Sequence, residues 1–108
     1  MKLIMAIVSN EDSNAVSHAL TKAGFSVTKL ATTGGFLRSG NTTLISGVED
    51  ERVNKAIEII SKKSSSRTQV VPTMSGSMDV GVYSSFPVEV TVGGATIFVL
   101  DVERFEKV

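Results

Sequence analysis

The sequence predicts an α+β fold of the ferredoxin-like, split βαβ type, and three observations support this prediction. Strand-length apolar runs alternate with two segments whose apolar residues repeat at helical spacing. The predicted order is βαββα, then a β segment, a long loop and a C-terminal hairpin, which is typical of two helices packed on one face of an antiparallel sheet. The 108 residues, 42% of them apolar, suffice for one modest core. We therefore expect a single domain over residues 1–108.

The first half of the chain is expected to form three strands and one helix. Continuous apolar or alternating patterns predict strands at residues 2–8, 25–32 and 41–48. Glu11 and Asp12 suit a helix N-terminus, and Gly24 suits a helix stop, so a helix is expected at about 11–23. A loop with three glycines, residues 33–40, separates the second and third strands.

The second half is expected to form a second helix and the remaining strands. An acidic start and two lysines at the end predict a helix at about 51–63. A serine linker leads to an extended segment, residues 67–73, which Pro72 directs to a sheet edge. Residues 74–87 lack any sustained period and are expected to be a functional or mobile loop. Strands at 88–92 and 95–102 are expected to form a hairpin around Gly93 and Gly94.

Composition narrows the classes of function. Eleven basic and eleven acidic side chains give no net charge, which disfavours a nucleic-acid-binding protein. With no cysteine and one histidine, no Cys-based or His-rich metal site is expected, and no cofactor is predicted. The first apolar run is too short for a signal peptide, and no apolar stretch approaches the ~20 residues of a membrane span. A soluble protein in a reducing cytoplasm is expected.

Residues suited to catalysis are few, and each has a simpler structural explanation. His18 lies off the apolar stripe of its helix, so we expect it to be a solvated surface residue. The acidic clusters at 11–12 and 49–51 lie where helix dipoles favour anions. The serines at 64–66 have no neighbouring base. An enzyme is therefore not predicted.

The glycine loop is the most informative stretch for function. Gly35 and Gly40, followed by Asn41 and Thr42, approach the phosphate-binding pattern of nucleoside triphosphatases but lack its lysine and its following helix. The backbone amides of residues 33–35 could bind an anion, and Phe36 and Leu37 offer an apolar face for a ring. Arg38 adds a positive charge, and the side-chain amide of Asn41 could pair with a base edge. These features suit a phosphate-bearing nucleotide. Alternatively, the glycines only turn the chain and Phe36 packs in the core.

Two long motifs resemble those of a known family. They are Phe-Ser-Val-Thr-Lys-Leu-Ala-Thr-Thr-Gly-Gly-Phe-Leu-Arg-Ser-Gly-Asn-Thr-Thr at residues 25–43 and Pro-Val-Glu-Val-Thr-Val-Gly-Gly-Ala-Thr-Ile-Phe at 87–98. The chain resembles the PII-like cyclic di-AMP receptors over nearly its whole length. The resemblance implies a βαββαβ sandwich that assembles as a cytoplasmic, non-enzymatic homotrimer. It also implies cyclic di-AMP in clefts between subunits, with loop changes that regulate an unidentified protein partner.

The same resemblance implies a set of ligand-binding residues: Thr28, Gly35, Phe36, Leu37, Asn41, Gly47 and, across the interface, Phe98. Thr28 and loop amides can hydrogen-bond phosphate, whereas Asn41 and the backbone at Gly47 can pair with an adenine edge. The aromatic and leucine side chains can wall the base. The resemblance makes residues 33–40 a short T-loop and the region after the second helix an enlarged B-loop.

Departures from the family pattern leave a second ligand open. Family members commonly carry Asn-Phe-Arg where this chain has Gly24, Phe25 and Ser26, and they tend to end in His-Gln-Phe. Met-Ser-Gly-Ser at 74–77 replaces a Pro-Met-Gly-Gly stretch. An amide and a guanidinium that could contact the ligand are therefore missing. The alternative prediction is a PII-like trimer that has lost cyclic di-AMP affinity and binds another adenine nucleotide.

Overall fold

The structure, a computed structural model, describes residues 1–30, 40–72 and 87–108. The described elements are β1 (Lys2–Ser9), α1 (Asn10–Lys22), β2 (Thr28–Leu30), β3 (Asn41–Val48), the 3₁₀ turn η1 (Asp50–Arg52), α2 (Val53–Ser64), β4 (Arg67–Pro72), β5 (Pro87–Val92) and β6 (Ala95–Asp101). Most of the glycine loop and the expected irregular loop at 74–87 lie outside the described residues.

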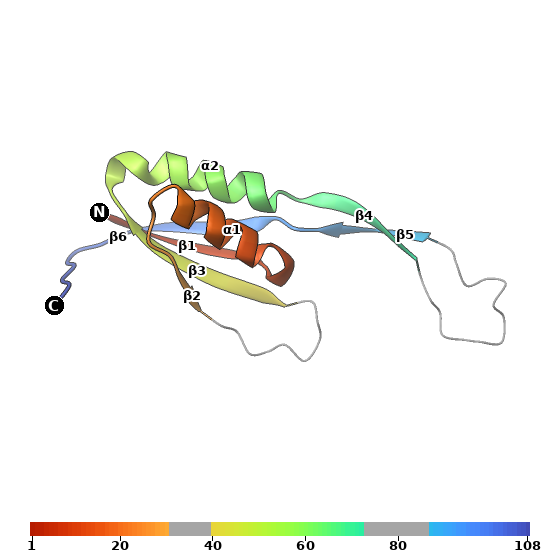
Figure 1. Cartoon of the computed structure of the whole chain (residues 1–108), viewed down its shortest axis with the longest axis horizontal. Helices are drawn as coiled ribbons and strands as arrows, with labels where there is room; N and C mark the ends of the chain where they lie inside the picture. The colour runs from red at the N-terminus through yellow and green to blue at the C-terminus, as the bar shows by residue number, and fades with distance from the viewer. Residues whose placement is uncertain (31–39, 73–86) are drawn as a thin grey trace.

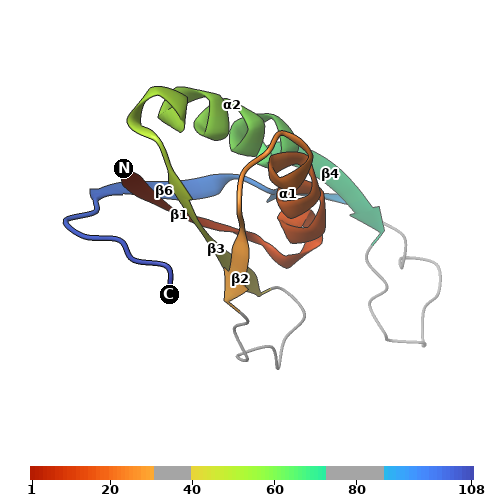
Figure 2. The same cartoon turned by 60° about the vertical axis from the view of Figure 1, so that its left-hand side comes forward.

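Four strands form one antiparallel sheet in the order β2-β3-β1-β6. Both helices lie on the same side of this sheet (Figures 1 and 2). This arrangement confirms the predicted α+β, ferredoxin-like fold. The expected strands at 2–8 and 41–48 and both expected helices are present, with small shifts at their ends.

The strands contribute alternate side chains to the core. On β1, the side chains of Ile4, Ala6 and Val8 are buried beneath the helices, whereas the intervening residues are only half-buried. The period of two along a strand produces this split, since successive side chains point to opposite faces. The core comprises Ile4, Ala6, Val8, Val16, Leu20, Phe25, Leu44, Val48, Ala56 and Ile60. Each large member contributes roughly 1.5–3 kcal/mol by leaving water.

The end of α1 confirms the predicted role of Gly24. Its φ of +96° is a conformation that glycine adopts readily. The Gly24 amide donates to the Thr21 carbonyl and the Phe25 amide donates to the Leu20 carbonyl, both at 3.0 Å, which is the Schellman arrangement. The buried Phe25 side chain then follows directly, with the Arg52 guanidinium 4.1 Å from its ring centroid.

Two expected elements begin later than predicted. The strand expected at 25–32 is described from Thr28 to Leu30, because the helix cap uses the Phe25 amide and the Ser26 carbonyl accepts from the Ser46 hydroxyl at 2.6 Å. The helix expected at 51–63 begins with the η1 turn, and its α-helical part is Val53–Ser64.

The expected hairpin around Gly93 and Gly94 is wrong. β5 pairs with β4, with Arg67 opposite Val92, and β6 pairs with β1 in the main sheet. The two glycines, with φ of +85° and +94°, instead carry the chain from one sheet to the other. A Cβ on Gly93 would come within 2.7 Å of the Ser65 carbonyl oxygen, so the backbone packs closely here. A Gly-Gly pair alone cannot reveal which strand its neighbours will join.

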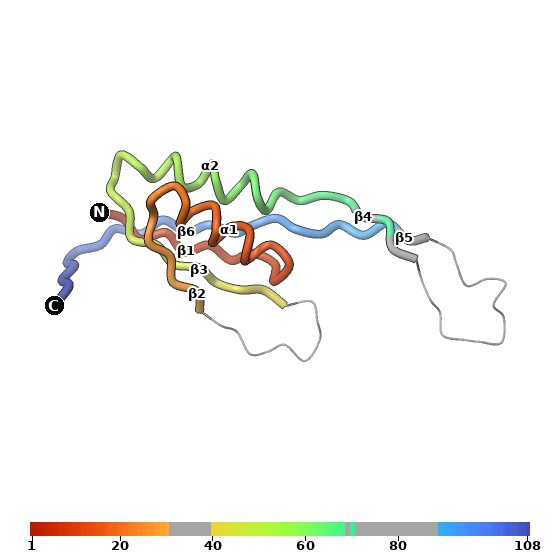
Figure 3. The backbone as a smooth tube through the Cα atoms, in the orientation of Figure 1, coloured from red at the N-terminus to blue at the C-terminus, as the bar shows by residue number. Residues whose placement is uncertain are grey.

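The β4–β5 pair forms an arm that extends away from the sandwich, as the tube in Figure 3 shows. The radius of gyration is 18.0 Å, whereas a compact domain of about 100 residues has roughly 13 Å. The arm is attached at its base by an ion pair. The Arg67 guanidinium lies 2.9 Å from a carboxylate oxygen of Asp12, at the start of α1.

Candidate functional site

The expected ligand residues that the structure describes all lie on one face of the main sheet. These residues are Thr28, Asn41, Gly47 and Phe98. Thr28 pairs with Ile45, which shares a face of β3 with Asn41 and Gly47, and Phe98 pairs with Met5 on the same face of β1. This is the face opposite the helices, and we call it the open face. Gly35, Phe36 and Leu37 lie outside the described residues.

Thr28 and Gly47 line one cavity of about 350 Å³ at the end of the open face. Ser26 lines the same cavity, so the position where the family pattern has arginine points at the expected site. The full lining is Leu3, Ser26, Thr28, Ile45, Ser46, Gly47, Phe105 and Lys107. We call it the Thr28 cavity.

Two tail residues of the Thr28 cavity, Phe105 and Lys107, were not predicted from the sequence. Their proximity follows from the register, because Leu3 pairs with both Gly47 and Leu100, so the chain leaving β6 emerges beside the end of β3. The Val102 amide also donates to the Met1 carbonyl at 3.2 Å. An aromatic residue in a tail of charged ones is the sequence signal that could have indicated this contact.

Gly47 has space around it within one copy. A Cβ built at this position would meet the Met1 sulfur at 3.8 Å, which is an ordinary van der Waals distance. Its φ is not positive. Nothing in the described part of the chain therefore requires glycine here, and its bare backbone is accessible to a partner or ligand.

Asn41 lies at the opposite end of β3. It lies six positions from Gly47, which is roughly 20 Å along a strand. Asn41 lines a different cavity, of about 270 Å³, between the start of α1 and β5. One copy therefore does not place Asn41 and Gly47 on the same adenine edge, and a shared site needs residues from two copies.

Phe98 is also remote from Thr28. It lies on β6, and β1 and β3 separate that strand from β2, a distance of roughly 14 Å at the usual strand spacing. Its side chain is 51% exposed, which is unusual for phenylalanine. Around it, the open face presents further apolar side chains from three strands: Leu3, Met5, Ile7, Ile45 and Leu100.

The start of α1 fixes the backbone next to Asn41. The Asn10 amide donates to the Gly40 carbonyl at 3.0 Å, and the Asn10 side-chain oxygen accepts from the Thr42 hydroxyl. A Cβ on Gly40 would lie 2.8 Å from Nδ2 of the Asn10 side chain, so the absence of a side chain at Gly40 permits this close approach. The phosphate-loop pattern that Gly35 and Gly40 approach is incomplete in the sequence, and Gly40 has this packing role in the structure.

The candidate catalytic residues do not converge. His18 is exposed on α1, as predicted. The buried carboxylate of Asp12 pairs with Arg67, and the Asp50 carboxylate pairs with the N-terminal amine at 2.9 Å. Hydrogen bonds from Arg67 and from the N-terminus lower the pKa values of Asp12 and Asp50, respectively. The Ser64 hydroxyl donates to the Ile60 carbonyl, and the described residues hold no group of metal-binding side chains.

The described helices include none that is long and apolar enough to cross a membrane.

Comparison with known proteins identifies the family. The sequence matches the family described as "Cyclic-di-AMP receptor" over residues 1–108. A similar solved structure is "The crystal structure of a functionally unknown protein from Pediococcus pentosaceus ATCC 25745", at 43% sequence identity and a TM-score of 0.77. The alignment covers 99% of this chain and 96% of that one. The chain therefore belongs to the cyclic-di-AMP receptor family, as its two long motifs indicated.

Proposed function

We propose that this protein is a homotrimeric, PII-like signal-transduction protein that binds cyclic di-AMP between its subunits. The carrying observation is the placement of Thr28, Asn41, Gly47 and Phe98, which share the open face but are too far apart to surround one ligand in one copy. Their distribution suits a site that neighbouring copies complete. We propose that the chain acts as one domain in the cytoplasm.

The apolar open face supports assembly. Exposed Phe98 and Leu100 lie beside half-buried Met5 and Leu3, and water contact with such a patch is unfavourable. The helices already cover the other face, so a second copy is the simplest cover. In a closed three-fold ring, each copy would present one end of its open face to the next.

The Thr28 cavity supports an anionic ligand. The Thr28 hydroxyl can donate to phosphate, and the Gly47 backbone can pair with a base edge. Lys107 is the one ionisable residue among those lining this cavity, and no ion pair within the described residues involves it. We propose that its ammonium group supplies the positive charge that Ser26 cannot.

Signalling would follow from the position of the site. β2, which carries Thr28, leads into residues 31–39, and Asn41 follows that segment, so a ligand held between Thr28 of one copy and Asn41 of a neighbour would bias the conformation of this segment. A protein partner that recognises this segment would then respond to the ligand. The protein itself carries out no chemistry in this proposal.

The second candidate ligand is another adenine nucleotide. It is favoured by Ser26, because the cavity presents a hydroxyl where the family pattern has a guanidinium. A ligand with a different phosphate arrangement would suit such a change.

Isothermal titration with cyclic di-AMP, ATP, ADP and AMP, together with light scattering, tests the proposal. We expect a mass of about three times 11.4 kDa without ligand and saturable binding of cyclic di-AMP. Thr28→Val should weaken binding by about tenfold through loss of a hydrogen bond to a charged group, whereas Thr21→Val on the helix side should not. Preferential binding of ATP, ADP or AMP would establish the second candidate.

Two results would overturn the proposed function. One is the absence of saturation for every nucleotide at concentrations near a millimolar. The other is a monomer at all concentrations, because the intersubunit site would then not exist. Recovery of unchanged ligand after long incubation with magnesium is expected, and turnover would instead indicate an enzyme.

A further inference from the structure

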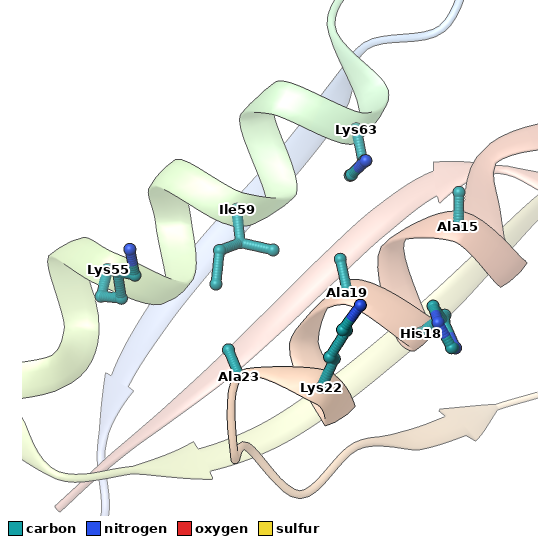
Figure 4. A pocket seen from close by; sticks show the side chains of 8 residues that line it. All are labelled: Ala15, His18, Ala19, Lys22, Ala23, Lys55, Ile59 and Lys63. Atoms are coloured by element: carbon teal, nitrogen blue, oxygen red, sulfur yellow. The ribbon is translucent and has the colours of Figure 1, made fainter.

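A groove runs between α1 and α2 on the side of the molecule opposite the open face. Its volume is about 450 Å³ (Figure 4). The buried side chains of Val16, Leu20, Ala56 and Ile60 fill the helix–sheet interface below it. The groove is therefore an outward-facing feature, separate from the nucleotide site proposed above.

The floor of the groove is apolar and shallow. Ala15 and Ala19 on α1 and Ala23, the residue that caps its end, are spaced four residues apart and point towards α2 (Figure 4). Ile59 points back from α2. Small side chains allow another backbone to approach closely. The floor can thus accept the apolar side of an extended or helical segment.

The edges of the groove are basic. Lys22 on α1 and Lys55 and Lys63 on α2 line it together with His18, and its lining includes no carboxylate. The whole chain has no net charge, so these lysines are a local concentration of positive charge. Among the described residues, one of the groove lysines takes part in an ion pair: Lys55 Nζ lies 3.7 Å from a carboxylate oxygen of Glu58, and both side chains are more than half exposed. Such an exposed pair is weak and leaves the charge available.

We propose that this groove, the lysine groove, binds an acidic amphipathic helix of a partner protein. Charge complementarity and the apolar floor together select this occupant, which would carry carboxylates flanking an alanine- or leucine-rich face. α1 has 13 residues and is therefore roughly 20 Å long. A partner segment of about 14 helical residues would span the groove.

Other anionic occupants fit the groove less well. Nucleic acid favours basic grooves with several aromatic or arginine side chains for stacking, whereas this lining has an alanine floor, no arginine and one aromatic ring, that of His18. A membrane surface would favour a helix with a bulky apolar face, and the exposed apolar side chains here are small. The open face is the better surface for a second copy of this chain.

The test measures binding of a fluorescein-labelled, 14-residue helical peptide with glutamates flanking an alanine–leucine face. Fluorescence anisotropy at about 50 mM salt should show saturation. The K22Q/K55Q/K63Q variant should weaken binding by about tenfold or more, since each exposed charge pair contributes about twofold to threefold. Ala19→Leu should also weaken binding because it fills the floor without changing charge.

Lys62 and Lys63 provide a matched control. They are neighbours at the end of α2, but Lys63 lines the groove and Lys62 does not. We expect Lys63→Gln to weaken peptide binding at least twofold more than Lys62→Gln. Far-ultraviolet circular dichroism of each variant should match the wild type.

Several results would overturn the proposal. Equal binding of a scrambled peptide of the same composition would show charge attraction without a groove. Equal effects of the two single lysine variants, or no effect of Ala19→Leu, would place the peptide elsewhere. Tighter binding of a 14-nucleotide DNA strand or of phosphatidylglycerol vesicles, lost in K22Q/K55Q/K63Q, would assign another occupant. A parallel titration of the protein with cyclic di-AMP measures the proposed nucleotide function separately. Failure of nucleotide binding in that titration would leave the peptide result unchanged, so the two proposals can fail independently.

Discussion

The two faces of the main sheet differ in what covers them. Leu44 on β3 faces the helices and is 2% exposed, whereas Leu100 on β6 faces the other way and is 44% exposed. Both faces are rich in apolar side chains, and the same strands supply both. The helix-covered face forms the core of one copy, and the open face carries those expected ligand residues that the structure describes.

The difference shows that apolar character alone does not define a core. On β1, Ile4 and Met5 are neighbours of similar hydrophobicity, yet Ile4 is buried beneath the two helices and Met5, on the opposite face, is only half-buried. The covered face stabilises the fold of a single copy. We expect the open face to contribute stability only through other copies, and this expectation can be tested one face at a time.

The largest expected effect is that of Phe98→Asp on assembly. Each interface would bury an unpaired carboxylate, which costs about 2 kcal/mol or more per copy. Light scattering should shift from about three times 11.4 kDa to the mass of one copy, with helical circular dichroism retained. Asn54→Asp adds a carboxylate on the exposed side of α2 and should leave the assembly intact. An unchanged mass for Phe98→Asp would mean that the open face is not the interface.

Two leucine truncations compare the faces directly. Leu44→Ala should lower the free energy of unfolding by about 2–5 kcal/mol at every protein concentration, because it leaves a cavity in the core. Leu100→Ala should have a smaller effect in urea unfolding, and that effect should grow with protein concentration as assembly buries the side chain. A concentration-independent loss for Leu100→Ala as large as that for Leu44→Ala would contradict the distinction between the faces.

Local patterns were sufficient to predict most of the fold. The acidic start and the Gly24 stop predicted α1, a continuous apolar run predicted β1, and a pattern rich in Thr, Leu and Ile predicted β3. The partner of β5 could not be predicted, because Gly93 and Gly94 permit either a tight hairpin or a crossing between sheets. Pairing of β6 with the edge of β1 favours the crossing over the hairpin. That edge exists only once the sheet has folded, so local sequence patterns do not reveal it.

The resemblance predicted which residues form the candidate site, but not how they are arranged. Motif resemblance supplied Thr28, Asn41, Gly47 and Phe98, whereas their common face depends on the strand register. Lys107 and Phe105 were missed because a tail has no period, and its path depends on where β6 ends. All of these ligand roles remain predictions, and Gly35, Phe36 and Leu37 also lie outside the described residues.

The affinity for cyclic di-AMP at the open face should depend on the charge at position 26. Ser26 lines the Thr28 cavity, so Ser26→Arg should add a charge-assisted contact of roughly 1.5–3 kcal/mol and tighten cyclic di-AMP binding by one to two decades. Lys107→Gln should have the opposite sign, and Lys62→Gln on the helix side should have no effect. Isothermal titration measures all three.

Gly24→Asn, which restores the amide of the family pattern, should not give a comparable gain. Gly24 has a positive φ in the helix cap, where a side chain introduces strain. Weaker binding by Ser26→Arg would indicate a cavity shaped for a different ligand. Unchanged binding would show that the new guanidinium is directed away from it.

The smallest expected effect is that of replacing Asp12, a buried charged residue on the helix-covered side of the sheet. Asp12 is 6% exposed. The Arg67 guanidinium and the Ser9 hydroxyl donate to its carboxylate, and the hydrogen bond from Arg67 is the main cause that lowers the Asp12 pKa below its ordinary value of 3.8. The carboxylate therefore stabilises the fold fully above that value. The contribution is lost as the pH falls through the lowered pKa of the folded state, because protonation then removes the charge.

Asp12→Asn should lower the free energy of unfolding by about 1 kcal/mol at pH 7, and the difference from wild type should vanish near pH 2. Urea unfolding at both pH values measures this difference. Cyclic di-AMP affinity at pH 7 should be unchanged, because Asp12 holds the arm to α1 rather than contacting the open face; a difference that persisted at pH 2 would mean that packing, not charge, gives Asp12 its effect.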